Sequence, residues 1–125
     1  MSRTTDCRPY EFIFDNYVTG HHVYKEVWDP FLGEELRCLR EPENLHDTNA
    51  IKIMRCEDDD VIGHVPKRFT RACSYVLLGG GSIVAMVIGP RENNRNNGLE
   101  VPVTYRVKGP REKMLTAEAL IKGRL

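Results

Sequence analysis

Three short segments of this 125-residue chain hold most of the side chains that could bind a ligand or carry out chemistry. The first is Gly20-His21-His22-Val23-Tyr24. The second runs from residue 40 to residue 51 and contains Asn44, His46 and Asp47. The third runs from residue 62 to residue 68 and contains His64 and Lys67. Imidazole, carboxylate and ammonium groups are the common acids, bases and anion ligands of proteins, so their spacing decides which chemistry is open to them.

The cysteines and histidines do not have the spacing of a zinc site, because no Cys-x-x-Cys and no His-x-x-x-His pair occurs. Cys38 falls in an expected strand and Cys73 on the expected buried face of a helix, where packing of a small apolar side chain explains both. The acidic run from residue 57 to 60 leaves two interpretations open, a solvated hairpin turn, which we favour, and a metal site. We expect no metal and no cofactor.

Catalytic signatures are equally scarce. Gly79-Gly80-Gly81 is not followed by Lys-Ser or Lys-Thr, so it does not fit a phosphate-binding loop. No Gly-x-Ser-x-Gly motif occurs. Asp47 and His64 could act as an acid–base pair only if the fold brings them together, and no nucleophile accompanies them. We therefore expect a binding module and not an enzyme.

Hydrophobic periodicity predicts a mainly β domain. Alternating or continuous apolar runs predict strands over residues 11–17, 36–40, 50–55, 61–65, 83–88 and 99–107, with a hairpin loop over 93–98. After Gly20, residues 22–24 are expected to continue the first strand as an extended segment. Trp28, Tyr17, Tyr75 and Tyr105 are expected to pack in the core or at its rim and not to serve as platforms for bases.

Two helices are expected between and after these strands. Behind Pro66, the apolar stripe of Phe69, Ala72, Cys73, Val76 and Leu77 predicts an amphipathic helix that ends at the glycine triplet. A weaker pattern follows Pro110, where Met114, Ala117, Leu120 and Ile121 could share one face. Strands joined by hairpins around one inserted helix fit a small, partly open antiparallel barrel of about six strands, OB-like or SH3-like, with one or two helices.

Composition and charge narrow the class further. The chain is 41% hydrophobic and 29% charged, typical of one soluble domain, with no apolar run long enough to cross a membrane. The N-terminus has no apolar stretch typical of a signal peptide, so we expect an intracellular protein, nuclear or cytoplasmic, with reduced thiols, and a monomer. The net charge of zero divides into −7 for residues 1–62 (7 basic, 14 acidic) and +7 for residues 63–125 (11 basic, 4 acidic).

The polar loop after residue 40 supports two interpretations. Asn44, Asp47 and Asn49 could merely accept hydrogen bonds from the loop's own backbone. Alternatively, a carboxylate such as Asp47 with Lys67 nearby would accept a hydrogen bond from a sugar hydroxyl but repel a phosphate. Such a pocket could distinguish the end of a polynucleotide from a continuing phosphodiester.

Together the three segments resemble the HIRAN domain. They contain a glycine followed by ring-bearing residues, the loop Arg-acid-Pro-x-Asn-x-x-Asp-x-Asn-Ala-Ile, and an Ile-Gly-His-x-Pro-Lys turn into a helix. The resemblance extends over about residues 10–108. It divides the chain into a flexible N-terminus (1–9), a HIRAN-like barrel (10–108) and a C-terminal helical extension (109–125).

The resemblance implies an OB-type barrel that captures the 3′-hydroxyl end of single-stranded DNA, with a setting in DNA repair. By motif position, Asp47 would accept the terminal hydroxyl and Asn44 would lie in the same pocket loop. His64 and Lys67 would line the pocket or contact phosphate, and Tyr24 would lie near the terminal nucleotides. Nucleic acid, as single-stranded DNA or another nucleic-acid end, is thus the expected partner.

Four positions depart from the pattern of the DNA-end binders. His22 replaces an arginine, Val23 and His46 replace stacking tyrosines, and Leu99 replaces an aromatic residue. Stacking contributes about 1–3 kcal/mol per base, and histidine rings can replace it only in part. The alternative is therefore a non-catalytic protein-interaction domain that kept the HIRAN fold but lost DNA-end binding, with a protein as its partner.

Lys67, Arg68 and Arg71 lie off the apolar stripe of the first helix, so they are expected to be exposed. They could form an ordinary solvated helix face or contact the phosphate backbone, with Arg91, Arg95 and Arg106 extending the basic patch. The complete set of expected nucleic-acid contacts is His22, Tyr24, Asn44, His46, Asp47, His64, Lys67, Arg68 and Arg71.

Overall fold

The computed structural model describes residues 8–20, 28–94 and 98–124. Its elements, in chain order, are β1 (Tyr10–Val18), β2 (Glu35–Arg40), β3 (Ile51–Arg55), β4 (Val61–His64), the 3₁₀ turn η2 (Lys67–Phe69), α1 (Thr70–Leu78), β5 (Ser82–Val87), β6 (Glu92–Asn94), β7 (Gly98–Gly109) and α2 (Arg111–Ile121). None of the helices in these ranges is long and apolar enough to span a bilayer.

The described strands form one antiparallel sheet in the order β1-β7-β5-β2-β3-β4, and β6 pairs with β7. The sheet curls so that its two outer strands meet at one point. There, Thr19 and His64 exchange backbone hydrogen bonds of 2.9 Å in both directions. Because the edge strands join only at this bridge within the described residues, the sheet is a partly open barrel, as the sequence predicted.

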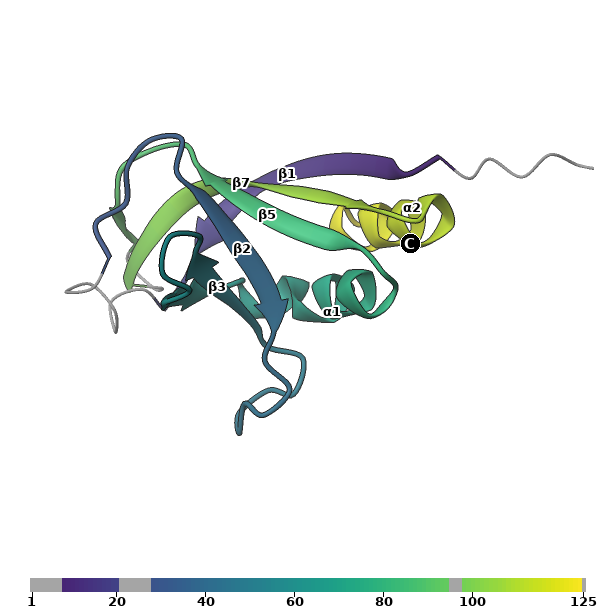
Figure 1. Ribbon diagram of the computed structural model, residues 1–125, viewed down its shortest axis with the longest axis horizontal. Helices are drawn as coiled ribbons and strands as arrows, with labels where there is room; N and C mark the ends of the chain where they lie inside the picture. Colours follow the sequence, from purple (N-terminus) through teal and green to yellow (C-terminus); the bar gives the residue numbers. More distant parts are fainter. Residues whose placement is uncertain (1–7, 21–27, 95–97, 125) are drawn as a thin grey trace, which may run out of the picture.

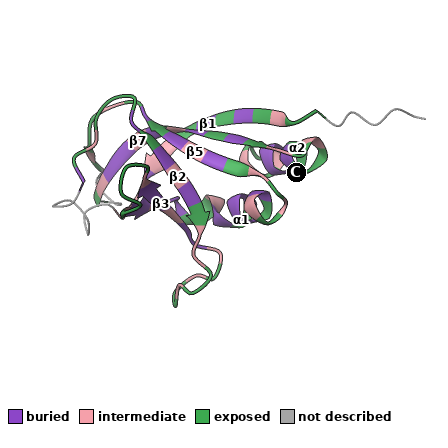
Figure 2. Cartoon of the chain, in the orientation of Figure 1, coloured by how far each residue is buried: buried purple, intermediate pink, exposed green. Residues whose placement is uncertain are grey.

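Alternation along the strands places one face of the sheet inside. Phe12, Phe14 and Val18 of β1 and Val103 and Tyr105 of β7 are buried, while their neighbours along each strand are more exposed (Figure 2). The phenol of Tyr105 is fully buried and donates a 2.6 Å hydrogen bond to the carbonyl of Tyr17. The core is thus built from period-two positions, the pattern that a half-buried strand requires.

Both helices lie on the same side of the sheet (Figure 1). α1 packs against β2, β3 and β5, α2 packs against β1 and β7, and the helices contact each other. The backbone at Gly81 and the backbone at Gly109 lie close together beside the fully buried Met114 of α2. A Cβ on Gly109 would come within 2.7 Å of the Cα of Gly81, and one on Gly81 within 2.7 Å of Val76. Glycine is needed at both positions.

Several local expectations are confirmed and three need correction. Trp28 and Tyr105 are in the core, as are both strand and helix cysteines, and burial raises the pKa of Cys73 to about 12. The first helical turn after Pro66 is 3₁₀ and not α. The expected loop over 93–98 begins instead as strand β6, because β7 offers a pairing edge to polar residues that carry no apolar period. Leu120 is 49% exposed, on the flank of α2 and not on its buried face.

Candidate functional site

The loop between β2 and β3 is organised by the side chain of Asn44. Its amide nitrogen donates to Oε1 of Glu41 at 2.8 Å, and its Oδ1 accepts from the backbone amides of His46 (2.8 Å) and Asp47 (3.1 Å). All of these contacts lie within the loop. Asn44 therefore positions the loop by satisfying backbone donors, and it also lines the cavity described below.

Asp47 is half-buried and uses its two carboxylate oxygens differently. Oδ1 accepts a 2.8 Å hydrogen bond from the backbone amide of Asn49. Oδ2 lies 3.3 Å from the hydroxyl of Thr70, but that hydroxyl is only 2.8 Å from the carbonyl of Lys67. A hydroxyl has one proton to donate, and the Thr70 hydroxyl donates it to the nearer acceptor, the carbonyl of Lys67. Oδ2 of Asp47 therefore keeps the capacity to accept another hydrogen bond.

Glu41 forms the other polar contact of the site. Its Oε1 lies 3.0 Å from Nε2 of His64, and both side chains are more than two-thirds buried. Burial raises the pKa of Glu41, but the hydrogen bonds from Asn44 and His64 outweigh it and lower the pKa below its ordinary value. An ionised Glu41 fixes the ring of His64 with Nε2 protonated. Sequence reasoning missed Glu41, although its place directly before Pro42 in the loop motif marked it.

Five of the sequence-predicted residues converge on one open cavity of about 250 Å³. The bridge between Thr19 and His64 brings β1 to β4, and the turn after Pro66 brings Lys67 to the same rim. Since a water molecule accounts for about 30 Å³ of liquid, the cavity has room for a group the size of a sugar. Its lining is Thr19, Asn44, His46, Asp47, Ala50, Ile51, His64, Val65, Lys67 and Thr70.

A second cavity of about 360 Å³ adjoins the first, since Thr19 and Lys67 line both. It holds Arg68, which thus lies beside the first cavity and not in it. Sequence reasoning did not assign its other polar residues to the site: Asn16, Tyr17 and Glu100. A hydrogen bond with Glu92 raises the pKa of Tyr17, which keeps its phenol neutral.

Of the remaining predicted residues, only Arg71 lies in a described range, and it is not part of this arrangement. Arg71 lines a separate groove between the helices, with Tyr75 and Leu120. His22 and Tyr24, with Val23, fall outside the described residues. Lys67, Arg68 and Arg71 are all exposed, as expected.

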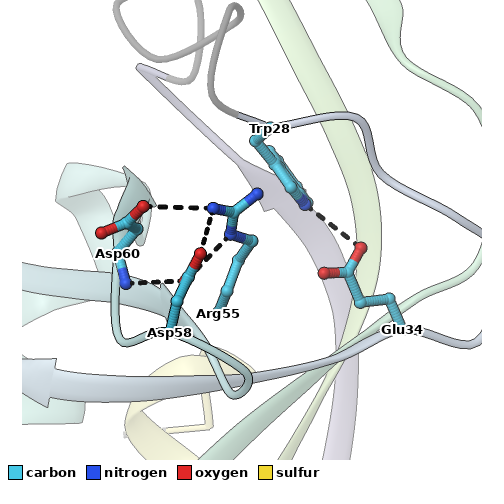
Figure 3. Close-up of polar contacts among 5 residues, drawn as sticks. All are labelled: Trp28, Glu34, Arg55, Asp58 and Asp60. Carbon is cyan, nitrogen blue, oxygen red and sulfur yellow. Dashed lines mark hydrogen bonds and ion pairs between the residues drawn. The ribbon is translucent and has the colours of Figure 1, made fainter.

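The acidic turn between β3 and β4 is held by an arginine (Figure 3). Arg55 donates through Nε to Asp58 at 3.1 Å and through Nη2 to Asp60 at 3.1 Å. The hydrogen bond from Arg55 lowers the pKa of Asp58. Nearby, the indole nitrogen of Trp28 donates to Glu34 at 3.1 Å. The acidic run is therefore a hairpin turn, the interpretation that the sequence favoured.

Comparison with known proteins gives one family and a consistent fold. A family model for the HIRAN domain matches residues 13–106. The crystal structure of the HIRAN domain of human HLTF is similar at a TM-score of 0.69 and 22% identity, covering 89% of this chain and 87% of that chain. The NMR structure of the HLTF HIRAN domain in its DNA-bound conformation has a TM-score of 0.66 at 23% identity, covering 89% and 86%.

A curated relative matches a shorter stretch. The Fanconi-associated nuclease 1 homolog of Arabidopsis thaliana is 30% identical over 63 residues, which is 50% of this chain. The chain spans only 7% of the length of that relative.

Proposed function

Because the chain belongs to the HIRAN domain family, we propose that it is a nucleic-acid-binding module that recognises single-stranded DNA at a 3′-hydroxyl end. The single observation that carries the proposal is the cavity whose lining contains both the carboxylate of Asp47 and the side chain of Lys67. Oδ2 of Asp47 accepts a hydrogen bond from the terminal hydroxyl, and Lys67 contacts the phosphate that precedes the terminal sugar. The DNA-bound conformation of the similar HLTF domain supports a nucleic-acid partner.

The carboxylate gives the cavity its selectivity for a free end. A 3′-hydroxyl donates a hydrogen bond to Asp47, whereas a phosphate at the same position is mostly dianionic at neutral pH and is repelled by the negative charge. His64, fixed by Glu41, and the exposed His46 supply ring surfaces beside the sugar. Arg68, in the adjoining cavity, continues the positive charge along the strand.

The proposal is for binding without turnover. Asp47 and His64 line the same cavity, but His64 bonds to Glu41, and Asp47 bonds to Asn49 and Thr70. That arrangement orients the two side chains through other residues and not through each other. We place the protein inside the cell, in the nucleus or cytoplasm, as a monomer, where single-stranded ends arise during repair.

The test compares three ends of one short, 5′-labelled oligonucleotide by fluorescence anisotropy. The 3′-hydroxyl form should bind most tightly, the 3′-deoxy form less tightly, and the 3′-phosphate form least. A hydrogen bond to a charged group contributes about 1.5–3 kcal/mol, so loss of the hydroxyl should weaken binding about 10- to 150-fold.

The alternative, a protein-interaction domain that lost DNA-end binding, predicts that all three forms bind equally and only in the non-specific range of about 10⁻⁴–10⁻⁶ M. Equal affinities would therefore contradict end recognition. A preserved order with the hydroxyl form tightest would exclude the alternative as the sole function.

A further inference from the structure

A groove of about 290 Å³ runs between the two helices, apart from the cavity that holds Asp47. One wall comes from η2 and α1 and the other from α2, a helix that follows the residues matched by the family model. Its lining is Arg68, Phe69, Arg71, Ala72, Tyr75, Leu120 and Ile121. Only Arg68 is shared with the adjoining cavity of the candidate site.

The groove exposes large apolar side chains on both walls. Tyr75 is 38% exposed and Leu120 is 49% exposed, and neither position is needed to complete the core. Leu78, one helical turn beyond Tyr75, is 69% exposed and extends the same face of α1. Apolar side chains grouped on both sides of a groove, as opposed to scattered singly, are typical of an interaction surface.

Positive charge borders the groove. Residues 67–78 contain Lys67, Arg68 and Arg71 and no aspartate or glutamate. Neither of the two glutamates on α2, Glu112 and Glu118, lines the groove, and Glu118 is bonded to Tyr10 and Lys122. An apolar floor with a cationic rim is complementary to an apolar ligand with a negatively charged surround.

We propose that this groove between the helices docks an acidic segment of a partner protein. The segment inserts one bulky apolar side chain between Tyr75 and Leu120, and its carboxylates face Arg68 and Arg71. The volume of the groove suits a single large anchor such as leucine or phenylalanine, as in the helix-in-groove mode of peptide recognition. The groove does not include Asp47, and Arg68 is the residue it shares with the cavity beside the candidate site.

The test uses a labelled amphipathic peptide of about 15 residues, long enough to form a helix on binding. Leucines stand at helical spacing on one face and glutamates occupy the other positions. Two control peptides carry lysine in place of glutamate, or the same composition with the leucines moved off one face. Anisotropy should show that the acidic amphipathic peptide binds at least tenfold more tightly than either control.

A matched pair of variants locates the binding. Leu120→Glu adds a negative charge in the groove and should weaken the peptide at least tenfold. Leu115→Glu adds the same charge at a 43% exposed position of the same helix that does not line the groove, and should leave the affinity unchanged. Equal thermal unfolding of both variants checks that neither change disturbs the fold.

Three results would overturn the proposal. One is equal binding of the acidic, lysine and rearranged peptides. Another is an equal response of the Leu120 and Leu115 variants. The third is displacement of the peptide by a 3′-hydroxyl oligonucleotide whose own affinity falls in Leu120→Glu, since that would make the groove part of the nucleic-acid path.

Discussion

Asp47→Asn is the most informative single change in the candidate site, because the structure determines what the new side chain does. An asparagine at this position keeps a carbonyl oxygen, which can go on accepting the 2.8 Å hydrogen bond from the backbone of Asn49. The loop therefore keeps its shape. The amide nitrogen then replaces Oδ2, so the cavity presents a donor with no charge where it had presented a charged acceptor.

The expected change in affinity has opposite signs for DNA that ends in a 3′-hydroxyl and for DNA that ends in a 3′-phosphate. A hydroxyl end loses a hydrogen bond to a charged group, which contributes about 1.5–3 kcal/mol, so its binding should weaken about 10- to 150-fold. A phosphate end loses a like-charge repulsion. Two unit charges about 4 Å apart repel by about 1 kcal/mol in water and about 4 kcal/mol near a protein surface. Phosphate-ended DNA should thus bind about fivefold more tightly, or better, and the preference should be lost or reversed.

The assay is fluorescence anisotropy with hydroxyl-ended and phosphate-ended oligonucleotides at one salt concentration. Glu43→Gln is the matched control, because Glu43 is an exposed carboxylate of the same loop that does not line the cavity. It removes the same charge, so it should strengthen both oligonucleotides slightly and leave their ratio unchanged.

A ratio that changes equally in the two variants would show that the charge of the loop acts at a distance and that Asp47 contacts no hydroxyl. A ratio unchanged in both would refute the reasoning altogether. In either case, end recognition would need a different residue.

The other predictions concern charge, pH and the core. Lys67→Ala should weaken both DNA ends and reduce the slope of log affinity against log salt by about 0.7, whereas Lys108→Ala, at the far end of β7, should leave the slope unchanged in a salt titration. The pKa of Glu41 is raised by burial but lowered overall by its hydrogen bonds, so its stabilising contribution is complete above its unfolded value of 4.5 and disappears as the pH falls toward the folded pKa. Glu41→Gln should therefore flatten the acid dependence of the free energy of unfolding, measured with urea between about pH 6 and about pH 3; an unchanged slope would contradict the role of this carboxylate. Tyr105→Phe should lower the free energy of unfolding by about 1–3 kcal/mol, because the carbonyl of Tyr17 loses its 2.6 Å partner. An unchanged free energy in urea denaturation would show that water replaces the hydroxyl.

Much of the fold could be predicted because its signals are local. The alternation of Ile51 and Ile53 and the stripe containing Cys73 and Val76 follow the periods of strand and helix, and each of these residues is buried. β6 could not be predicted in this way, because its three polar residues form a strand only where β7 offers an edge. Leu120 likewise fits a helical period, but only the packing of α2 determines that it lies on the flank of the buried face, where it lines the groove.

Some residues of the candidate site could be predicted from the sequence, but their contacts could not. The sequence alone determined that Asn44, Asp47, His64 and Lys67 belong to a recognisable loop and turn, since those motifs are contiguous in the chain. Only the tertiary structure decided that Asn44 bonds within the loop, that Asp47 approaches Thr70, and that Glu41 contacts His64. The physical reason is distance along the chain, because backbone preferences act over a few residues. The approach of residue 41 to 64, and of 47 to 70, depends instead on the register of β2, β3 and β4 and on the turn from β4 into α1.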